Sequence, residues 1–235
     1  MFEREHHRRV AAILESLDSV PLDAAQCLFG GGTAIALRHG EFRESVDIDF
    51  LVSDREGYRQ LRQRLSGRDG IAAIVRDGRT LVQAREVRAD QYGIRTMLRA
   101  VDIDIKFEIV LEARIGLERP GPADRICGVA TLTPLDMATS KLLANSDRWR
   151  DDAVMSRDLI DLAMMAPRKA LLRQAIDKAS QAYGLSIESD LVKAIDDLRA
   201  RPHRLDHCMR AMQMDRVSKA QLWARIRALR PPPRP

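Results

Sequence analysis

Gly31-Gly32-Thr33, followed by Ser45-Val46-Asp47-Ile48-Asp49-Phe50, is the stretch of this chain that decides its fold. Its second part lies in a largely apolar run that predicts a β-strand over residues 46–52. Side chains two positions apart on a strand point to the same face, so this strand would present Asp47 and Asp49 side by side. The glycine pair allows the backbone to approach a bound group closely. The sequence therefore predicts a glycine turn beside a strand that carries two carboxylates on one face.

The pairing of this turn with two carboxylates indicates phosphate chemistry. Like charges on one face repel each other unless a cation lies between them. Carboxylate oxygens suit Mg²⁺, which usually takes one or two carboxylates and completes its shell with phosphate oxygens. Backbone N–H groups of a glycine turn bind phosphates. These features are typical of a site that transfers a nucleotide, with Asp47 and Asp49 as its metal ligands and catalytic residues.

The other segments predict a small mixed sheet followed by helices. Periodicity and turn residues predict helices at 3–18, 33–39 and 54–65 and strands at 26–29, 71–76, 80–87, 94–98 and 101–109. The turn at 118–122 is a candidate boundary, and helical patterns run from Thr133 to Leu229 with breaks near Pro167, Gly184 and Pro202. The expected fold class is α/β (α+β), with a sheet domain over 1–120, a mainly helical domain over 121–230 and a disordered tail over 231–235.

Composition excludes several classes of protein. The 235 residues suffice for two small domains, and the three cysteines are odd in number and far apart. That cysteine pattern fits reduced thiols in the cytoplasm better than a disulfide framework. No zinc-ligand spacing is present, and no apolar run approaches the length of a membrane span. We therefore expect a cytoplasmic protein without a membrane partner.

The positive charge of the chain is concentrated near its C-terminus. Residues 199–235 contain ten Arg or Lys and two Asp, whereas the preceding residues are net acidic. A basic segment of this kind is a plausible electrostatic footprint for nucleic acid. The alternative is a set of solvated helices in an arginine-rich protein, and the composition alone does not decide between the two.

The glycine and aspartate elements resemble the signature of the DNA polymerase β-like nucleotidyltransferases, a superfamily with a mixed sheet. More narrowly, they are similar to the AbiEii/AbiGii toxin family, with its Gly-Gly-Thr and Ser-x-Asp-Ile-Asp elements. Two later stretches, Lys141-Leu142-Leu143-Ala144 and Arg157-Asp158-Leu159-Ile160-Asp161-Leu162, are similar to helical elements of the same family. The resemblance extends from Gly31 to Leu162, and no motif after Pro167 matches. It differs at Gly30, where the family often has a basic residue, and in a longer linker between Lys141 and Arg157.

The resemblance implies Mg²⁺, with two ions expected and Mn²⁺ possible, and a nucleoside triphosphate as substrate. Gly31, Gly32 and Thr33 would cradle the triphosphate, with Ser45 either bonding a phosphate or capping the turn. The third metal carboxylate would come from the alternating strand at 101–109. The Lys-x-Glu element of the family assigns it to Glu108, with Lys106 as a nucleotide-binding neighbour. Asp104 lies on the same face and remains the alternative, and Asp102 is a weaker one.

The helical elements imply a cation and a carboxylate for the same reaction. Lys141 would neutralise charge on the triphosphate. The chain has only six lysines against 33 arginines, so a lysine at this motif position indicates that a compact ammonium is wanted against a phosphate. Asp158 and Asp161 share a helix face. One of them would position Lys141 or act as a base, and the other would bridge helices; we favour Asp158 for the site.

The resemblance further implies a toxin of a bacterial toxin–antitoxin or phage-defence system, with a cognate antitoxin as partner. It would move a nucleotide to an RNA, with the 3′ end of a tRNA as the suspected acceptor. Three other functions remain open: transfer to a small molecule such as an aminoglycoside, transfer to a protein side chain, and nucleotide binding without catalysis.

Overall fold

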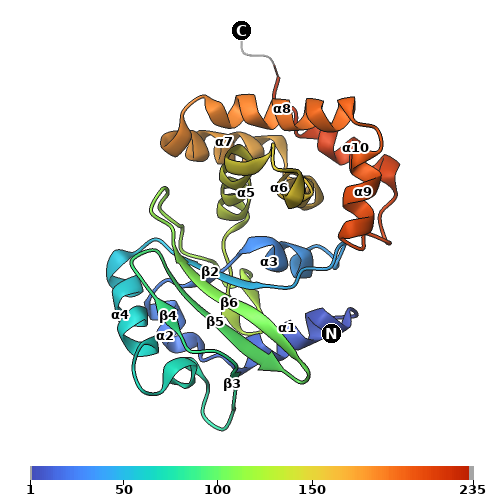
Figure 1. Cartoon of the computed structure of the whole chain (residues 1–235). Coiled ribbons are helices and arrows are strands. Elements are labelled where there is room, and N and C mark those ends of the chain that lie inside the picture. Colours follow the sequence, from blue (N-terminus) through green and yellow to red (C-terminus); the bar gives the residue numbers. More distant parts are fainter. Residues whose placement is uncertain (1, 233–235) are drawn as a thin grey trace. The chain divides into compact units, whose positions relative to one another are not determined.

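The computed structural model describes residues 2–232, which form two compact units. The first unit comprises Met1–Arg38 and Ser45–Thr133, and the second comprises His39–Glu44 and Pro134–Pro235. Figure 1 shows the sheet of the first unit in blue to green and the helices of the second in yellow to red. Each unit is described by itself below. The mixed sheet followed by helices confirms the expected α/β (α+β) fold class.

A mixed sheet of six strands organises the described part of the first unit. The strands are β1 (Leu28–Phe29), β2 (Ile48–Val52), β3 (Val82–Gln83), β4 (Arg88–Ala89), β5 (Gly93–Ala100) and β6 (Ile103–Leu111). Their order is β1-β2-β6-β5-β3, and β4 also pairs with β5. Strands β2 and β6 run parallel, whereas the other pairs are antiparallel. The two strands that were expected to carry the carboxylates are therefore direct neighbours.

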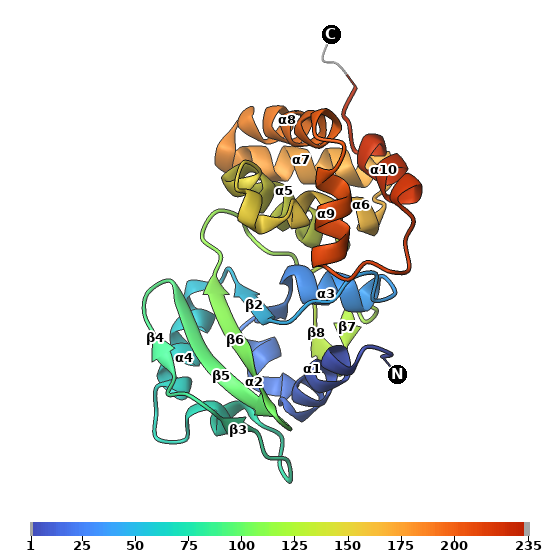
Figure 2. The ribbon, with the colours of Figure 1, turned by 45° about the vertical axis from the view of Figure 1, so that its right-hand side comes forward.

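Apolar and polar side chains alternate along the strands and give the sheet an apolar face and a polar face. Ile48, Phe50 and Val52 of β2 are fully buried, and the rings of Phe29, Phe50 and Phe107 contact one another in a row across β1, β2 and β6. Helix α1 (Glu5–Ser16) packs against β5, and α4 (Arg55–Leu65) packs against β2 (Figure 2). The intervening positions, which include Asp49 and Glu108, form the opposite, polar face.

Short elements complete the first unit. Helix α2 (Ser19–Ala24) follows α1, and α3 (Gly31–Arg38) follows β1 after a single residue. The hairpin of β7 (Arg125–Ile126) and β8 (Val129–Ala130) lies beyond the turn at 118–122 but belongs to this unit, since Phe29 of β1 bridges to Thr131.

One strand prediction in this unit was wrong, and another was too long. Residues 71–76 contain a 3₁₀ helix, η1 (Gly70–Ile74), instead of a strand. Gly70 has φ +52°, and the N–H of Ile71 donates to the Gln83 side chain rather than to a neighbouring strand. The expected strand at 80–87 is reduced to the two residues of β3, because the chain pairs with β5 there only briefly before β4 pairs with it again.

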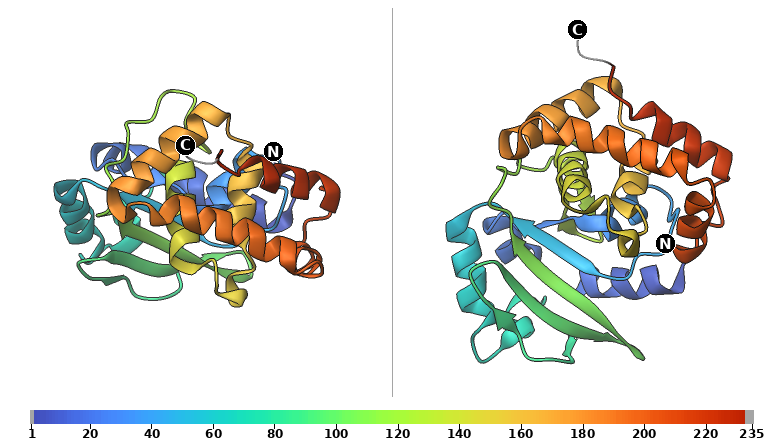
Figure 3. Two further views of the ribbon diagram at one scale, coloured as in Figure 1. Left: turned by 90° about the horizontal axis from the view of Figure 1, so that it is seen from above. Right: turned by 45° about the horizontal axis from the view of Figure 1, so that its top comes forward.

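The second unit is helical. Its helices are α5 (Pro134–Arg148), α6 (Arg157–Met165), α7 (Lys169–Tyr183), α8 (Ser186–Ala200), α9 (Arg204–Ala211) and α10 (Lys219–Ala228), with a short 3₁₀ helix, η2 (Asp152–Val154), before α6. Helix α5 packs against α6, α7 and α8, and α10 packs against α6 (Figure 3). Helix breaks fall at Pro167, Gly184 and Pro202, as expected, and two further breaks, at 149–156 and 212–218, were not expected.

Within residues 2–232, the helices are all too short or too polar to traverse a lipid bilayer. Most of the tail expected to be disordered, residues 233–235, lies outside the described residues.

Candidate active site

Asp47 and Asp49 lie at the start of β2. The strand begins at Ile48, so Asp47 immediately precedes it and Asp49 is its second residue. Both carboxylates are half-buried, and the parallel register places Asp49 directly beside Glu108 of β6. Asp49 and Glu108 therefore lie side by side on the polar face, and Asp47 directly precedes the strand.

The absence of a side chain at Gly31 leaves room for the Asp49 carboxylate. Gly31 has φ +67°, a conformation that favours glycine, and an added Cβ atom would lie 2.6 Å from the Asp49 Oδ2 atom. The N–H of the preceding Gly30 donates to the Asp49 carbonyl at 2.8 Å. Gly31 and Gly32 open α3, and the first N–H groups of a helix have no partners within the helix. Gly31 thus lies against a carboxylate, and the glycine pair begins a helix whose free N–H groups suit an anion.

Thr33 and Ser45 hold the segment that leads into β2. The Thr33 hydroxyl is buried, donates to the Asp47 carbonyl at 2.5 Å and shares a 2.8 Å hydrogen bond with the Ser45 hydroxyl. These bonds tie α3 to the chain around Asp47. In this arrangement both hydroxyls support the carboxylate segment, and phosphate contacts by them remain predictions.

Two histidines that sequence reasoning did not single out hold the same segment. The N–H of Ser45 donates to Nε2 of His7 at 3.1 Å, and Nε2 of His6 lies 3.0 Å from the Val46 carbonyl. His7 is completely buried. Both histidines come from the N-terminal end of α1, and 38 positions separate His7 from Ser45. No local pattern marks them, so only the tertiary fold reveals their role.

Glu108 is surrounded by cations. Its Oε1 accepts a 2.5 Å bond from Nε of Arg95, which lies directly opposite on β5, and its Oε2 is paired with Lys106 on its own strand. Burial opposes the charge of Lys106, but the carboxylates of Glu108, Asp49 and Asp47 outweigh it and raise the Lys106 pKa. Lys106 therefore lies within the field of all three predicted ligands.

The alternative third ligands are paired elsewhere. Asp104 forms an ion pair with Arg99, its cross-strand neighbour on β5, and Asp102 forms one with Arg9 of α1 at 2.7 Å. Among residues 2–232, no three His, Cys, Asp or Glu side chains are arranged to hold a metal ion together. The half-exposed pair Asp47 and Asp49 supplies the hard oxygen ligands that Mg²⁺ prefers, so these two residues fit the ion best.

Lys141 lies in the second unit, in a buried network of alternating charges. Its ammonium is 2.9 Å from Asp158 and 2.7 Å from Asp161, both on α6. The guanidinium of Arg148 pairs with Asp158 through two nitrogens, at 2.7 and 3.0 Å. Arg43 pairs with Asp161 in the same way, at 2.6 and 2.9 Å, although no sequence motif singled it out. Asp158 and Asp161 thus both contact Lys141.

The network favours the charged forms of Asp158 and Lys141. Burial opposes ionisation of Asp158, but Lys141 and Arg148 outweigh it and hold the pKa of that carboxyl well below its usual range. Burial likewise opposes the charge of Lys141, and Asp161 and Asp158 outweigh it and raise the Lys141 pKa. A carboxylate this strongly paired makes a poor proton acceptor, so the geometry favours a positioning role for Asp158 over a role as base.

The predicted site residues therefore fall into two groups. The first unit brings together Gly31, Gly32, Thr33, Ser45, Asp47, Asp49, Lys106 and Glu108. The second unit brings together Lys141, Asp158 and Asp161.

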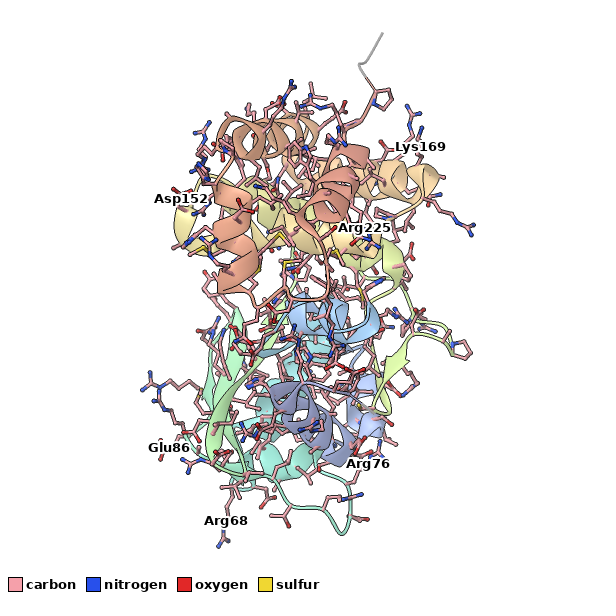
Figure 4. The ribbon with its side chains drawn as sticks, turned by 90° about the vertical axis from the view of Figure 1, so that its right-hand side faces the viewer. Arg68, Arg76, Glu86, Asp152, Lys169 and Arg225 are labelled. Carbon is pink, nitrogen blue, oxygen red and sulfur yellow. The ribbon has the colours of Figure 1, made fainter. Side chains whose placement is uncertain are left out.

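The basic C-terminal segment is partly neutralised by acids of its own unit. Arg201 and Arg204 pair with Asp152, Lys219 with Asp206 and Arg230 with Asp196. Arg225 donates weakly to the Met164 carbonyl and is exposed on α10 (Figure 4). Fewer cations are therefore available to a partner than the sequence suggests.

Comparisons with known proteins place this chain in a family. The family model for the AbiEii nucleotidyl transferase toxin of type IV toxin–antitoxin systems matches residues 12–229. JHP933 from Helicobacter pylori aligns over 98% of this chain and 94% of its own, with a TM-score of 0.50 and 17% identity. A presumed nucleotidyltransferase from H. pylori aligns over 96% and 93%, with a TM-score of 0.49 and 17% identity. No curated protein matches. The family match extends over nearly the whole chain, so this protein belongs to the AbiEii toxin family and is a nucleotidyltransferase.

Proposed function

We propose that this enzyme transfers a nucleoside monophosphate from a nucleoside triphosphate to an RNA acceptor, with Mg²⁺ bound by Asp47 and Asp49. The observation that carries the proposal is the half-exposed carboxylate pair with the Gly31 backbone packed against Asp49. A divalent ion bound there would stabilise charge on the oxygens that attack and leave. The glycine pair at the start of α3 would receive the triphosphate, and Thr33, Ser45 and His7 would keep Asp47 and Asp49 in place.

The other predicted site residues have supporting roles. Lys141 would neutralise the triphosphate, an assignment that rests on its sequence motif, and Asp158 and Asp161 would keep its ammonium charged and oriented. Lys106 would bind nucleotide, and Glu108 was assigned as a third metal ligand, with Asp104 as the alternative. Mn²⁺ would substitute for Mg²⁺ because it accepts the same hard ligands.

The acceptor is proposed on two grounds. The family acts in type IV toxin–antitoxin systems, so a target inside the producing cell and a cognate antitoxin are expected. The C-terminal helices carry more cations than anions, and this surplus suits a polyanion such as RNA, with the tRNA 3′ end as the suspected substrate.

The test is a labelling experiment. The protein is incubated with each α-³²P-labelled nucleoside triphosphate, Mg²⁺ and total cellular RNA, and a second reaction replaces the RNA with cellular protein. We expect one nucleotide to label RNA, and the Asp47→Asn variant to label nothing. Label in the protein fraction alone, or only in small molecules, would replace RNA with one of the other acceptors.

A further inference from the structure

Glu108 occupies a position in the sheet that places two cations beside it. Arg95 lies directly opposite on antiparallel β5, and Lys106 lies two residues earlier on the same face of β6. Each cation binds a different oxygen of the carboxylate, whose side chain is only 11% exposed. Both oxygens are therefore already used by partners from the protein.

This arrangement follows from the backbone register. Residues directly opposite on antiparallel strands face each other, and residues two apart on one strand share a face. The neighbouring pair of Arg99 and Asp104 repeats the same cross-strand arrangement further along β5 and β6. A divalent ion bound by Glu108 would have to lie close to two positive charges, and such repulsion weakens binding.

Lys106 has the properties of a cation that belongs to the site. It pairs with Glu108, and the parallel register places Asp49 directly beside Glu108. Its ammonium is a compact charge with three donors, in a chain where arginine is far more common. An ammonium in this place reduces the repulsion between carboxylates that a metal ion would otherwise have to offset.

We infer that Glu108 is a positioning residue that clamps Lys106 and Arg95, and that Lys106 serves as a permanent cation where a second metal ion was expected. The protein then binds one divalent ion, on Asp47 and Asp49. This inference rests on the proposed function, since it assigns the charges of the same site, and it replaces the assignment of Glu108 as a third ligand.

The experiment counts bound Mn²⁺ by electron paramagnetic resonance in protein without nucleotide. We expect one bound ion in the wild type. In Glu108→Gln, the released Lys106 would turn toward Asp47 and Asp49 and weaken Mn²⁺ binding about tenfold, because an added positive charge disfavours the ion. The double variant Lys106→Met/Glu108→Gln removes that competitor and should return the dissociation constant to within about threefold of wild type.

The matched control is the neighbouring pair, as Arg99→Met/Asp104→Asn, which should leave Mn²⁺ binding unchanged. Circular dichroism verifies that each variant is folded. If Glu108 is a ligand, the double variant stays as weak as Glu108→Gln, and the inference is overturned. Two ions in the wild type, with one lost in Glu108→Gln, would overturn it as well. Rescue in a protein that labels no RNA would support the inference and contradict the proposed acceptor.

Discussion

Two clusters of charged side chains, one in each unit, differ in burial and in the sign of their surplus charge. The sheet cluster consists of Asp47, Asp49, Arg95, Lys106 and Glu108. The helix cluster consists of Arg43, Lys141, Arg148, Asp158 and Asp161. In the sheet cluster, three carboxylates outnumber two cations, and in the helix cluster, three cations outnumber two carboxylates.

The difference in burial determines what each cluster can do. The side chains of Arg95 and Lys106 are 42% and 43% exposed, whereas those of Lys141 and Asp161 are 8% and 0% exposed. Pairs that are half exposed contribute little to stability, so the sheet cluster is not needed to hold the fold and can serve binding. Buried pairs resist separation, because each charge would be left without solvent or partner. The sheet cluster is therefore suited to chemistry, and the helix cluster to holding one cation in place.

The largest effect is expected when the carboxylate surplus of the sheet cluster is reduced. Asp49→Asn keeps the side-chain volume and removes a metal ligand, so nucleotide transfer should fall by about 1,000-fold or more, since a bound metal ion contributes several kcal/mol to catalysis. Single-turnover transfer measures the loss, and thermal unfolding should show a protein at least as stable as wild type, because one source of repulsion is gone. Transfer at the wild-type rate would remove Asp49 from the site.

The helix cluster should respond in stability. Asp161→Ala leaves Arg43 and Lys141 buried without their shared carboxylate, and we expect a loss of about 3 kcal/mol or more in the free energy of unfolding. Asp197→Ala is the matched control, because it removes an aspartate paired with Arg201 at the surface, where such pairs contribute less than about 1 kcal/mol. Urea unfolding measures both, and equal losses would mean that the helix cluster is no more than a set of surface pairs.

The pH dependence of stability should reveal Asp158. Its folded pKa lies below the value of about 3.9 for an unfolded chain, so its contribution is complete above that pH and is lost as the pH falls further. We expect wild type to exceed Asp158→Asn by an amount on the order of 2 kcal/mol at pH 7 and by progressively less below about pH 4. Urea midpoints across this range measure the difference. A gap that stays constant down to pH 2 would indicate packing as its source.

A smaller effect is expected at Gly31, next to the sheet cluster. Gly31→Ala adds a Cβ atom against the Asp49 carboxylate, whereas Gly40→Ala, also at positive φ (+78°), meets no atom within 4 Å. Both variants should lose about 1 kcal/mol of stability from backbone strain. Only Gly31→Ala should also weaken Mn²⁺ binding and slow transfer, because its Cβ atom would displace the Asp49 carboxylate. Each effect should be roughly tenfold for every 1.4 kcal/mol that this displacement requires. Equal transfer by the two variants would separate Gly31 from the site.

The smallest effect is expected from the exposed cations of α10. Arg225→Glu/Arg227→Glu should raise the KM for RNA several-fold and leave the KM for nucleoside triphosphate unchanged. Each RNA phosphate that these arginines no longer neutralise should flatten the salt dependence of binding by about one unit. Arg68→Glu, in the first unit, is the control for charge reversal as such (Figure 4). If this control raises the RNA KM equally, the C-terminal helices have no special role.

The sequence predicted those elements whose signal is local. The alternation around Asp49 and across 101–109 gave strands that the structure confirms within two residues at each end, and Pro167, Gly184 and Pro202 marked real helix breaks. The short elements between residues 70 and 90 were not predicted correctly, because an apolar run of a few residues is compatible with either a strand or a 3₁₀ turn.

The site was predictable only where one motif carried it. Arg43, His7 and Arg95 contact predicted site residues across 118, 38 and 13 positions, respectively. Such contacts depend on strand register and helix packing, and neither leaves a pattern in a single sequence. The charges around Glu108 follow from the pairing of β5 with β6, so the sequence could name the carboxylate without revealing what neutralises it.

The parallel pairing of β2 and β6 has a consequence for synthesis of the chain. Asp49 meets Glu108 only after α4 and β3 to β5 have been made and a long loop has closed, a type of contact that forms slowly in folding. A chain still emerging from the ribosome and lacking β6 has the glycine turn and both aspartates, but not the strand that bears Lys106 and Glu108. The sheet cluster is thus completed only after β6 has been made, so its two aspartates precede their charged neighbours in synthesis.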